Sequence, residues 1–429
     1  MAKVLITGNE ALAESCLRAG CRFFSGYPIT PQSAILEYLS WRMDELGGNC
    51  VQTESELAGI NMLLGAASAG ARALTTTSGP GFSLKQEGIS YLCASDVPAV
   101  IADIMRIGAG LGDIFAGQGD YWQMTRGGGH GDYRTIVLAP ASVQETADLA
   151  YMSFDLAEKY RHPVIIATDG AIGEMIESVE LPEMKEHDID TYDWAIRPRK
   201  DGEKQRVIWN RFWDLGNDEY PIYLVNKYNE IEANEQRWES VQTEDAEIVL
   251  VAYGISSRVA KSAVIRARKE GMKLGLIRPI TLWPYPKKAF EALGPQVKAF
   301  LDIEMNILGQ MTDDIILADG NKHPVTHGTY IPLMQSYDRV LRKSAFDSLY
   351  SVYGQFRNTS AATLSAQLKQ LFFYAKVRKY PSTLDAALDG TEVPTEIYRN
   401  LIDAVHRSFA PMYRYVGLRK KLLGLDELH

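Results

Sequence analysis

The first 170 residues alternate largely apolar stretches with amphipathic ones, and this alternation constrains the fold more than any other feature of the sequence. Apolar stretches such as 98–106 are typical of buried strands, whereas 142–160 carries apolar side chains at helical spacing. Strands that alternate with helices favour a parallel sheet covered on both faces. We therefore predict an α/β fold, with strands at 22–27, 49–54, 72–78, 98–106, 135–140 and 163–170 and helices at 9–20, 32–46, 56–70, 81–95 and 142–160.

The remainder of the chain divides into three parts by composition. Residues 181–244 are rich in charged and aromatic residues without clear periodicity, so we predict a linker or excursion after a first domain at 1–180. Strand and helix patterns return at 245–322, which predicts a second, smaller α/β domain. The last part, 323–429, is predicted to be a mostly helical tail that docks other subunits.

Composition and charge exclude several classes of function. The net charge of −9 over 429 residues argues against non-specific binding of nucleic acid and against a basic membrane-binding surface. The sequence has no apolar run of about 18 residues and no signal-peptide pattern, which predicts a cytoplasmic protein. Its four cysteines form no C-x-x-C pair, so we expect reduced thiols and no metal site on this chain.

Polar residues follow four of the predicted strands, at the edge where parallel sheets bind ligands. The first turn, 26–33, reads GYPITPQS, and its two prolines forbid helix and strand pairing there. The second turn carries two glutamates, the third reads SGPG and the fourth begins with an arginine. The candidate side chains are Tyr27, Pro28, Thr30, Glu54, Glu56, Ser78, Gly79, Gly81 and Arg106.

Each of these features also has a plainer interpretation. Either glutamate can simply favour the positive end of a helix dipole, and Arg106 can form a surface ion pair. The SGPG turn can bind an anion or be only a tight turn. The glycine-rich stretch at 126–132 resembles a phosphate loop but matches neither the P-loop nor G-x-G-x-x-G, and His130 with Asp132 alone does not make a metal site. The combination at successive strand ends is what favours a ligand site.

Three stretches together resemble a known family: GYPITPQS at 26–33, TESELAGINMLLGAASAGARALTTTSGPGFSL at 53–84, and QGDYWQMTRGGGHGDYRTIVLAPASVQE at 118–145. They are similar to the pyrimidine-domain subunit of the 2-oxoacid:ferredoxin oxidoreductases, most of all to the branched-chain members. The resemblance covers about residues 4–310. It implies a thiamine-diphosphate enzyme that converts a 2-oxoacid and CoA to acyl-CoA, CO2 and reduced ferredoxin, and a second domain of the transketolase C-terminal type.

The resemblance also implies roles for particular residues. Thr30 corresponds to the threonine beside the reacting carbons, and Arg106 to the arginine near the substrate carboxylate and CoA. Glu56 corresponds to the glutamate that bonds to N1′ of the aminopyrimidine, with Glu54 as the second choice. A carboxylic acid there stabilises the tautomer in which the cofactor takes its own C2 proton. The remaining cofactor contacts implied are Tyr27, Pro28, Ile29, Ser78 and Gly79.

One missing motif implies partner chains. Free-standing thiamine enzymes carry a Gly-Asp-Gly loop for Mg²⁺ and the diphosphate, and this sequence has none. We therefore expect the diphosphate and Mg²⁺ to be held by a thiamine-diphosphate-binding beta subunit. A gamma subunit and a ferredoxin-like iron–sulfur subunit are further expected partners, with a flavoprotein subunit if the electrons reach NAD. Hetero-oligomers of this kind are expected to pair as dimers, and the isolated chain is expected to be inactive.

Two other functions compete with this interpretation. The chain could be a non-catalytic scaffold that keeps the fold, in which case Thr30 and Glu56 are dispensable. It could also be a transketolase-like or acetolactate-type enzyme, which the missing metal loop disfavours. The substrate is open at this point: branched-chain and aromatic 2-oxoacids, such as phenylglyoxylate, stand level, ahead of 2-oxoglutarate and pyruvate.

Overall fold

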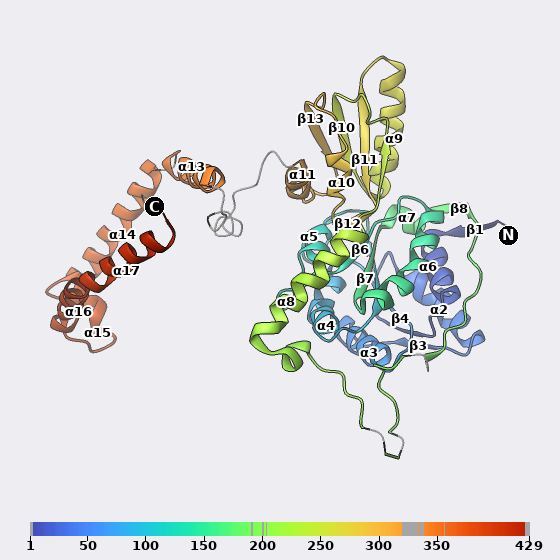
Figure 1. Ribbon diagram of the computed structural model, residues 1–429, viewed down its shortest axis with the longest axis horizontal. Coiled ribbons are helices and arrows are strands. Elements are labelled where there is room, and N and C mark those ends of the chain that lie inside the picture. Colours follow the sequence, from blue (N-terminus) through green and yellow to red (C-terminus); the bar gives the residue numbers. More distant parts are fainter. Residues whose placement is uncertain are drawn as a thin grey trace. The chain divides into compact units, whose positions relative to one another are not determined.

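A seven-stranded sheet forms the centre of the first part of the chain (Figure 1). Its strand order is β12-β6-β7-β5-β4-β2-β3, and all neighbours are parallel except the edge strand β12, which runs antiparallel to β6. The α/β class predicted from the sequence is confirmed. The strands are β2 (Phe23–Gly26), β3 (Asn49–Gln52), β4 (Ala73–Thr77), β5 (Ala99–Met105), β6 (Ile136–Leu138), β7 (Pro163–Asp169) and β12 (Thr281–Trp283). This computed structural model describes residues 3–189, 192–199, 201–202, 204–319, 334, 339–355 and 357–424.

Helices cover both faces of this sheet because successive strand residues point to opposite sides. On β5, Val100 and Ile104 join the core formed with α1, α2 and α6, whereas Ile101 and Met105 join the core formed with α3 and α4. The second core continues into the next domain through Val249 and Ile277. The helices are α1 (Gly8–Arg18), α2 (Ser33–Glu45), α3 (Glu56–Ser68), α4 (Pro80–Ala94), α5 (Tyr121–Thr125), α6 (Val143–Tyr160) and α7 (Gly170–Glu174).

A four-stranded sheet of order β13-β10-β11-β9 forms the second domain. Its strands β10 (Ile248–Ala252), β11 (Leu274–Pro279) and β13 (Ala299–Ile303) are parallel, and β9 (Trp238–Val241) runs antiparallel to β11. The helices of this domain are α9 (Gly254–Lys269), α10 (Lys287–Glu291) and α11 (Thr312–Asp319). A small antiparallel pair, β1 (Val4–Thr7) with β8 (Ile176–Val179), packs against α1 and α6 of the first domain.

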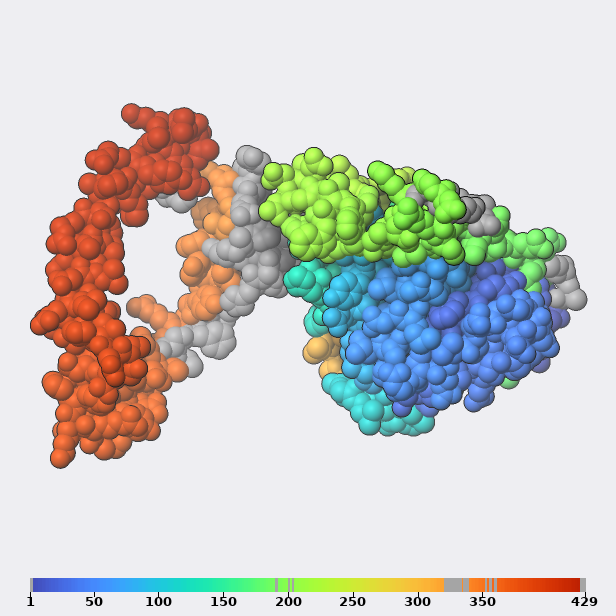
Figure 2. Space-filling view, turned by 90° about the horizontal axis from the view of Figure 1, so that it is seen from below, coloured from blue at the N-terminus to red at the C-terminus, as the bar shows by residue number. Residues whose placement is uncertain are grey.

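The region 181–244, whose pattern predicts no regular element, contains the long helix α8 (Arg211–Asn234) as well as β9. The helix is kinked at Gly216, which has non-helical backbone angles, and it contains Pro221. Both residues normally break helices, so the sequence does not predict a helix here. Figure 2 shows the yellow-green residues of this region along the blue surface of the first domain. Asp96 fixes the helix there, through Tyr223 and Lys227, each at 2.6 Å.

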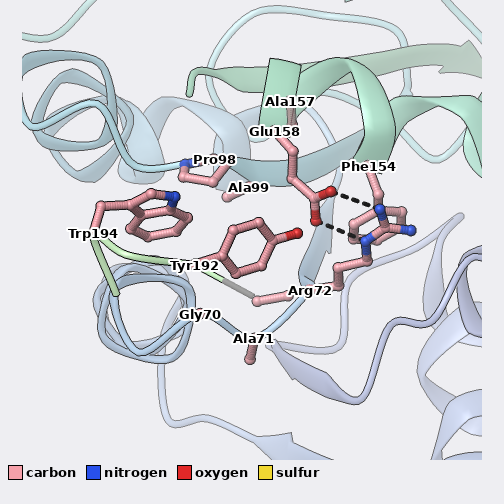
Figure 3. Close-up of a pocket in the computed structure, with 11 residues that line it drawn as sticks. Gly70, Ala71, Arg72, Pro98, Ala99, Phe154, Ala157, Glu158, Tyr192 and Trp194 are labelled. Carbon is pink, nitrogen blue, oxygen red and sulfur yellow. Dashed lines mark hydrogen bonds and ion pairs between the residues drawn. The ribbon is translucent and has the colours of Figure 1, made fainter. Parts of the chain in front are cut away.

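The start of the same region packs at the amino-terminal edge of the sheet, away from the predicted site (Figure 3). Arg72 and Glu158 form a two-bond ion pair there, at 2.7 and 2.6 Å. Tyr192 and Trp194 lie beside it and close a pocket with a volume of only about 10 Å³. This pocket is therefore too small for an organic ligand.

The C-terminal unit, 325–429, is a separate compact body. Its described elements are helices, and α16 has an apolar stripe made of the exposed residues Ile397, Leu401 and Val405 with their neighbours. The helices are α13 (Arg339–Gln355), α14 (Arg357–Val377), α15 (Thr383–Asp389), α16 (Thr395–Arg407) and α17 (Phe409–Leu422). Among the residues that the structure describes, no helix is long and apolar enough to cross a membrane.

Candidate functional site

The four predicted turns meet at one edge because β3, β2, β4 and β5 are neighbours in the sheet and run in parallel. The backbone carbonyl of Thr30, in the first turn, accepts a hydrogen bond of 2.9 Å from Nη1 of Arg106, in the fourth. A Cβ atom on Gly79, in the third turn, would lie 3.4 Å from Cγ of Arg106. The structure thus brings together Thr30, Gly79 and Arg106, as the sequence predicts.

The first turn is held by a side chain that the sequence did not single out. Gln32 donates to the Tyr27 carbonyl at 2.9 Å and accepts from the hydroxyl of Thr76 at 2.6 Å. Tyr27 and Thr30 are exposed, and Pro28 and Ile29 are half-buried. The turn therefore presents its predicted contact residues outward while Gln32 anchors it to β4.

The two glutamates of the second turn differ sharply in solvent exposure. Glu56 is the first residue of α3 and only 6% exposed, whereas Glu54 is exposed and accepts a bond from Ser55. The Glu56 carboxylate lies over Gly81, where an added Cβ would be 2.6 Å from Oε1 of Glu56 and 2.2 Å from Oγ1 of Thr77. Gly81 thus leaves the space that the buried carboxylate occupies.

Arg106 is 7% exposed, which argues against the surface ion pair considered above. Its Nη2 donates to the Leu111 carbonyl at 2.7 Å, and its Nε has no hydrogen-bond partner. The side chain therefore closes the loop of 107–111 against the first turn and keeps a donor for a ligand.

Two buried aspartates beside Arg106 were not predicted. Burial and the neighbouring Asp120 carboxyl raise the pKa of Asp103 well above its usual range, and burial also raises the pKa of Asp120. Burial and the charge of its neighbour thus disfavour the ionised form of Asp103. A charged residue in the middle of the apolar stretch PAVIADIMR is the signal that could have revealed Asp103.

The glycine-rich stretch at 126–132 does not offer a phosphate loop. The amides of Gly128 and Gly129 donate to the hydroxyl of Tyr133 at 3.1 and 2.8 Å, and Tyr133 in turn donates to Gln86. His130 and Asp132 are exposed. Over the described parts of the chain, no group of three metal-binding side chains was found.

A cleft with a volume of about 860 Å³ opens beside these turns. Gly79, Arg106 and Asp120 line one side, and the segment 304–308 of the second domain lines the other. Gln118 holds the two sides together, since its amide and side chain bond with Met305 and its Nε2 donates to Tyr253. Burial and Asp302 raise the pKa of Glu304, on the far side, to about 8.

Buried polar atoms without partners gather at the same edge, which is what a site built for a polar ligand leaves in a ligand-free chain. They are Thr77 Oγ1, Ser78 Oγ, both Asp103 oxygens, Arg106 Nε and Asp120 Oδ2. With the buried Glu56 carboxylate and the cradle at Gly81, these groups fit an aminopyrimidine that needs a carboxylate partner and polar contacts.

Comparison with known proteins agrees with this geometry. The family model described as "Pyruvate flavodoxin/ferredoxin oxidoreductase, thiamine diP-bdg" matches residues 14–247, more than half of the chain. Ketoisovalerate oxidoreductase subunit VorB of Methanothermobacter marburgensis is 50% identical over 322 residues, which cover 75% of this chain and 91% of the relative. The chain belongs to the 2-oxoacid:ferredoxin oxidoreductase family. It is a subunit of a thiamine-diphosphate-dependent 2-oxoacid oxidoreductase, as the sequence predicts.

The second domain matches the model "Pyruvate:ferredoxin oxidoreductase core domain II" at residues 246–332. Among solved structures, the 2-oxoglutarate:ferredoxin oxidoreductase from Magnetococcus marinus aligns with a TM-score of 0.64 and 26% identity. The alignment covers 75% of this chain but only 61% of that longer chain. The two family models thus meet at residues 246–247, close to the predicted start of the second domain.

The C-terminal unit has a different relationship. The model "Peptidase family M3" matches residues 332–429. Oligopeptidase PepF of Bacillus subtilis is 46% identical over 111 residues, which are 26% of this chain and 17% of that protein. The chain therefore spans a small fraction of the peptidase relative. Its sequence contains no His-Glu-x-x-His motif, the helical motif that binds zinc in many metallopeptidases.

Proposed function

We propose that this chain supplies the pyrimidine-facing half of a thiamine-diphosphate site in an enzyme that oxidatively decarboxylates a branched-chain 2-oxoacid. The products with CoA are an acyl-CoA and CO2, and the electrons pass to iron–sulfur clusters. The observation that carries the proposal is the Glu56 carboxylate, buried at the edge where four strand-end turns meet.

Each residue of the edge has a part in this proposal. Thiamine diphosphate, when bound, supplies the nucleophilic carbon and the electron sink that decarboxylation needs. Glu56 would hold the N1′ atom, with Ser78, Gly79 and the turn residues 27–29 beside the ring. Thr30 would orient the 2-oxo group and Arg106 the carboxylate of the substrate, since a guanidinium binds a carboxylate well.

The substrate assignment combines similarity with charge. The relative with 50% identity is named a ketoisovalerate oxidoreductase, whereas 2-oxoglutarate synthase subunit KorA of Methanocaldococcus jannaschii is 38% identical and the solved 2-oxoglutarate enzyme is 26% identical. Arg106 is the one basic side chain among the described residues that line the cleft, which also contains Asp120 and Glu304. A dicarboxylate such as 2-oxoglutarate would find one cation for two charges, whereas a branched-chain 2-oxoacid has a single carboxylate. Phenylglyoxylate, which is also monoanionic, is the second candidate.

Partner chains would provide the remaining chemistry. We assign Mg²⁺ and the diphosphate to a beta subunit, and the iron–sulfur clusters to a gamma and a ferredoxin-like subunit, with ferredoxin or NAD as acceptor. Three of the four cysteines here are buried, and burial raises the pKa of Cys16, Cys21 and Cys93 well above the usual range. Such thiols are poor cluster ligands because the thiolate is the form that binds metal.

The domain roles remain predictions. The first domain at 1–180 would face the cofactor, and the domain at 245–322 would line the cleft and pack against a partner. The docking role predicted for 323–429 stays a prediction as well.

The test uses the assembled complex, isolated through a tag on this chain. Viologen reduction is measured with CoA, Mg²⁺ and thiamine diphosphate, and with 2-oxoisovalerate, phenylglyoxylate, 2-oxoglutarate and pyruvate in parallel. We expect the highest kcat/KM with 2-oxoisovalerate and its loss in Glu56→Gln but not in Glu54→Gln. A Glu56→Gln complex with full activity would instead support a scaffold role.

A further inference from the structure

Residues 119–123, GDYWQ, belong to a stretch of the sequence to which the proposed function gives no part. They lead into the short helix α5. Their hydrogen bonds run in two directions, toward the second domain and toward the turn SGPG at 78–81. Helix α5 therefore connects the far wall of the cleft with one of the turns that the cofactor is proposed to contact.

On one side, Gln310 binds α5 to the second domain. The side chain of Gln310 accepts a hydrogen bond of 2.9 Å from the amide of Trp122 and donates at 2.9 Å to the carbonyl of Gly119. The indole of Trp122 donates in turn to the Gln310 carbonyl at 2.8 Å. Gln310 is only 8% exposed, so water competes little for these bonds, and α5 is fixed to the chain that follows the cleft segment 304–308.

On the other side, Gln123 binds α5 to the SGPG turn and to the helix that follows it. The Nε2 atom of Gln123 donates to the Gly79 carbonyl at 3.3 Å and to Oδ1 of Asp120 at 2.6 Å. Its Oε1 atom accepts a hydrogen bond of 2.8 Å from the hydroxyl of Ser83, in the first turn of α4. Both polar atoms of the Gln123 amide are thus bonded, which fixes the orientation of the side chain.

The SGPG turn needs such contacts because of the backbone of Gly79. Its φ of 47° and ψ of −107° lie outside the regions that residues with a side chain adopt. A conformation of this kind persists only where the surrounding structure holds it. The neighbouring Ser78 hydroxyl is buried without a hydrogen-bond partner among the described residues, as expected of a turn that is held ready for a ligand.

We infer that Gln123 is a positioning residue that keeps the SGPG turn in the conformation that contacts the cofactor, and that Gln310 acts on this turn through Gln123. The inference rests on the proposed function, because Ser78 and Gly79 are cofactor contacts only in that proposal. It gives the second domain a part in cofactor binding, since Gln310 belongs to that domain. A purely structural Gln123 would instead affect the stability of the chain and leave the affinity for the cofactor unchanged.

The experiment measures the Kd of the cofactor-depleted complex for thiamine diphosphate in excess Mg²⁺, by isothermal titration, and the thermal unfolding of the same complex without the cofactor. Gln123→Met keeps the length of the side chain and removes its hydrogen bonds. Gln86→Met is the matched control, since the Gln86 amide donates at 2.7 Å to the backbone carbonyl of Gln123 and, among the described residues, not to the turn. Ser83→Ala, at an exposed position, removes one bond of the Gln123 amide and replaces Gln123→Met if that variant does not assemble.

We expect the Kd for thiamine diphosphate to rise about 5- to 10-fold in Gln123→Met and about two- to threefold in Ser83→Ala, the range for the loss of one hydrogen bond. Gln86→Met should stay within about twofold of wild type, even where it unfolds at a lower temperature, because it does not contact the turn. A wild-type Kd in Gln123→Met, or in Ser83→Ala where it takes its place, would overturn the inference. An equal rise in Gln86→Met would overturn it as well.

A double variant tests the route through Gln123. Gln310→Met should raise the Kd about two- to fivefold by itself but add nothing to Gln123→Met, because residues that act through one another are not additive. Additive rises would show that Gln310 does not act through Gln123 and would overturn that part of the inference. Glu56→Gln in the same titration tests the proposed function separately: if it matches wild type while Gln123→Met loses affinity, the proposed role of Glu56 fails and that of Gln123 stands.

Discussion

The strand-end edge of the first domain and helix α16 of the C-terminal unit show the difference between a pattern and a site. At the edge, four segments distant in sequence bury polar side chains against one another, with Arg106 bonded to the Thr30 carbonyl and Glu56 over Gly81. In α16 an equally regular apolar pattern has no buried residue among those described. A regular apolar pattern therefore predicts a helix, whereas polar side chains that several distant segments bring together predict a ligand site.

The comparison is tested most strongly at Glu56. Glu56→Gln should lower kcat of the assembled complex by about 100-fold or more, the usual range for a residue that controls a proton in the reaction. The exposed neighbour provides a matched control, and Glu54→Gln should stay close to wild type. Initial rates of viologen reduction under saturating cofactor measure both, and equal losses in the two variants would contradict the assignment.

Arg106 gives the next largest expected effect. Arg106→Lys keeps a charge but loses the planar fork that reaches two backbone carbonyls, so the loop of 107–111 loses a partner. Under the proposed function, the substrate carboxylate loses one as well. We expect kcat/KM to fall by about 10- to 100-fold, the range for losing a hydrogen bond to a charged group. The exposed Arg266 offers a control, since Arg266→Lys should have no effect. A KM for the 2-oxoacid that stays at the wild-type value would argue against carboxylate binding.

Gly81 tests the packing beneath the carboxylate. A methyl group there would meet Thr77 and Glu56, so Gly81→Ala should cost about 1–3 kcal/mol of stability and displace the Glu56 side chain. Gly65 lies in α3, where an added methyl group would have nothing within 4 Å, and Gly65→Ala should be neutral or slightly stabilising. Thermal unfolding together with thiamine-diphosphate affinity distinguishes the two variants. Similar stability and affinity in both variants would show that the position of Gly81 accepts a methyl group as readily as an exposed helix does.

Removal of the C-terminal unit should have the smallest effect on catalysis. A chain ending at Pro324 retains every residue assigned to the site, and the alignment with the VorB relative covers 91% of that relative with only 75% of this chain. We expect the specific activity of the complex to be within about twofold of that of the full chain, as for changes at a distant, independent site. The subunits that co-purify in the same preparation test the predicted docking role, and a loss of activity within an intact complex would contradict the prediction.

Local patterns were enough to predict the main sheet and most of its helices. The apolar strands and capped helices of the first domain lie close to their predicted positions, and the four turns meet because parallel strands place their ends at one edge. Helix α8 was missed because Gly216 and Pro221 break its pattern. Strand β12 is not among the predicted strands, because its pairing with β6 is non-local.

The site was only partly predictable for a similar reason. Glu56 and Arg106 stand next to strand ends, where position alone indicates function. Asp103 lies inside a strand, and its importance depends on which groups other segments bring beside it. Similarly, the sequence shows an amphipathic α16 but not what contacts its apolar face.

A structure of the assembled complex with thiamine diphosphate bound would test the assigned role of Glu56 most directly. We predict that a carboxylate oxygen of Glu56 lies about 2.6–3.2 Å from N1′ of the pyrimidine, with the diphosphate and Mg²⁺ on a partner chain. A pyrimidine held by another residue, or a cofactor bound away from the edge formed by β2, β3, β4 and β5, would contradict it.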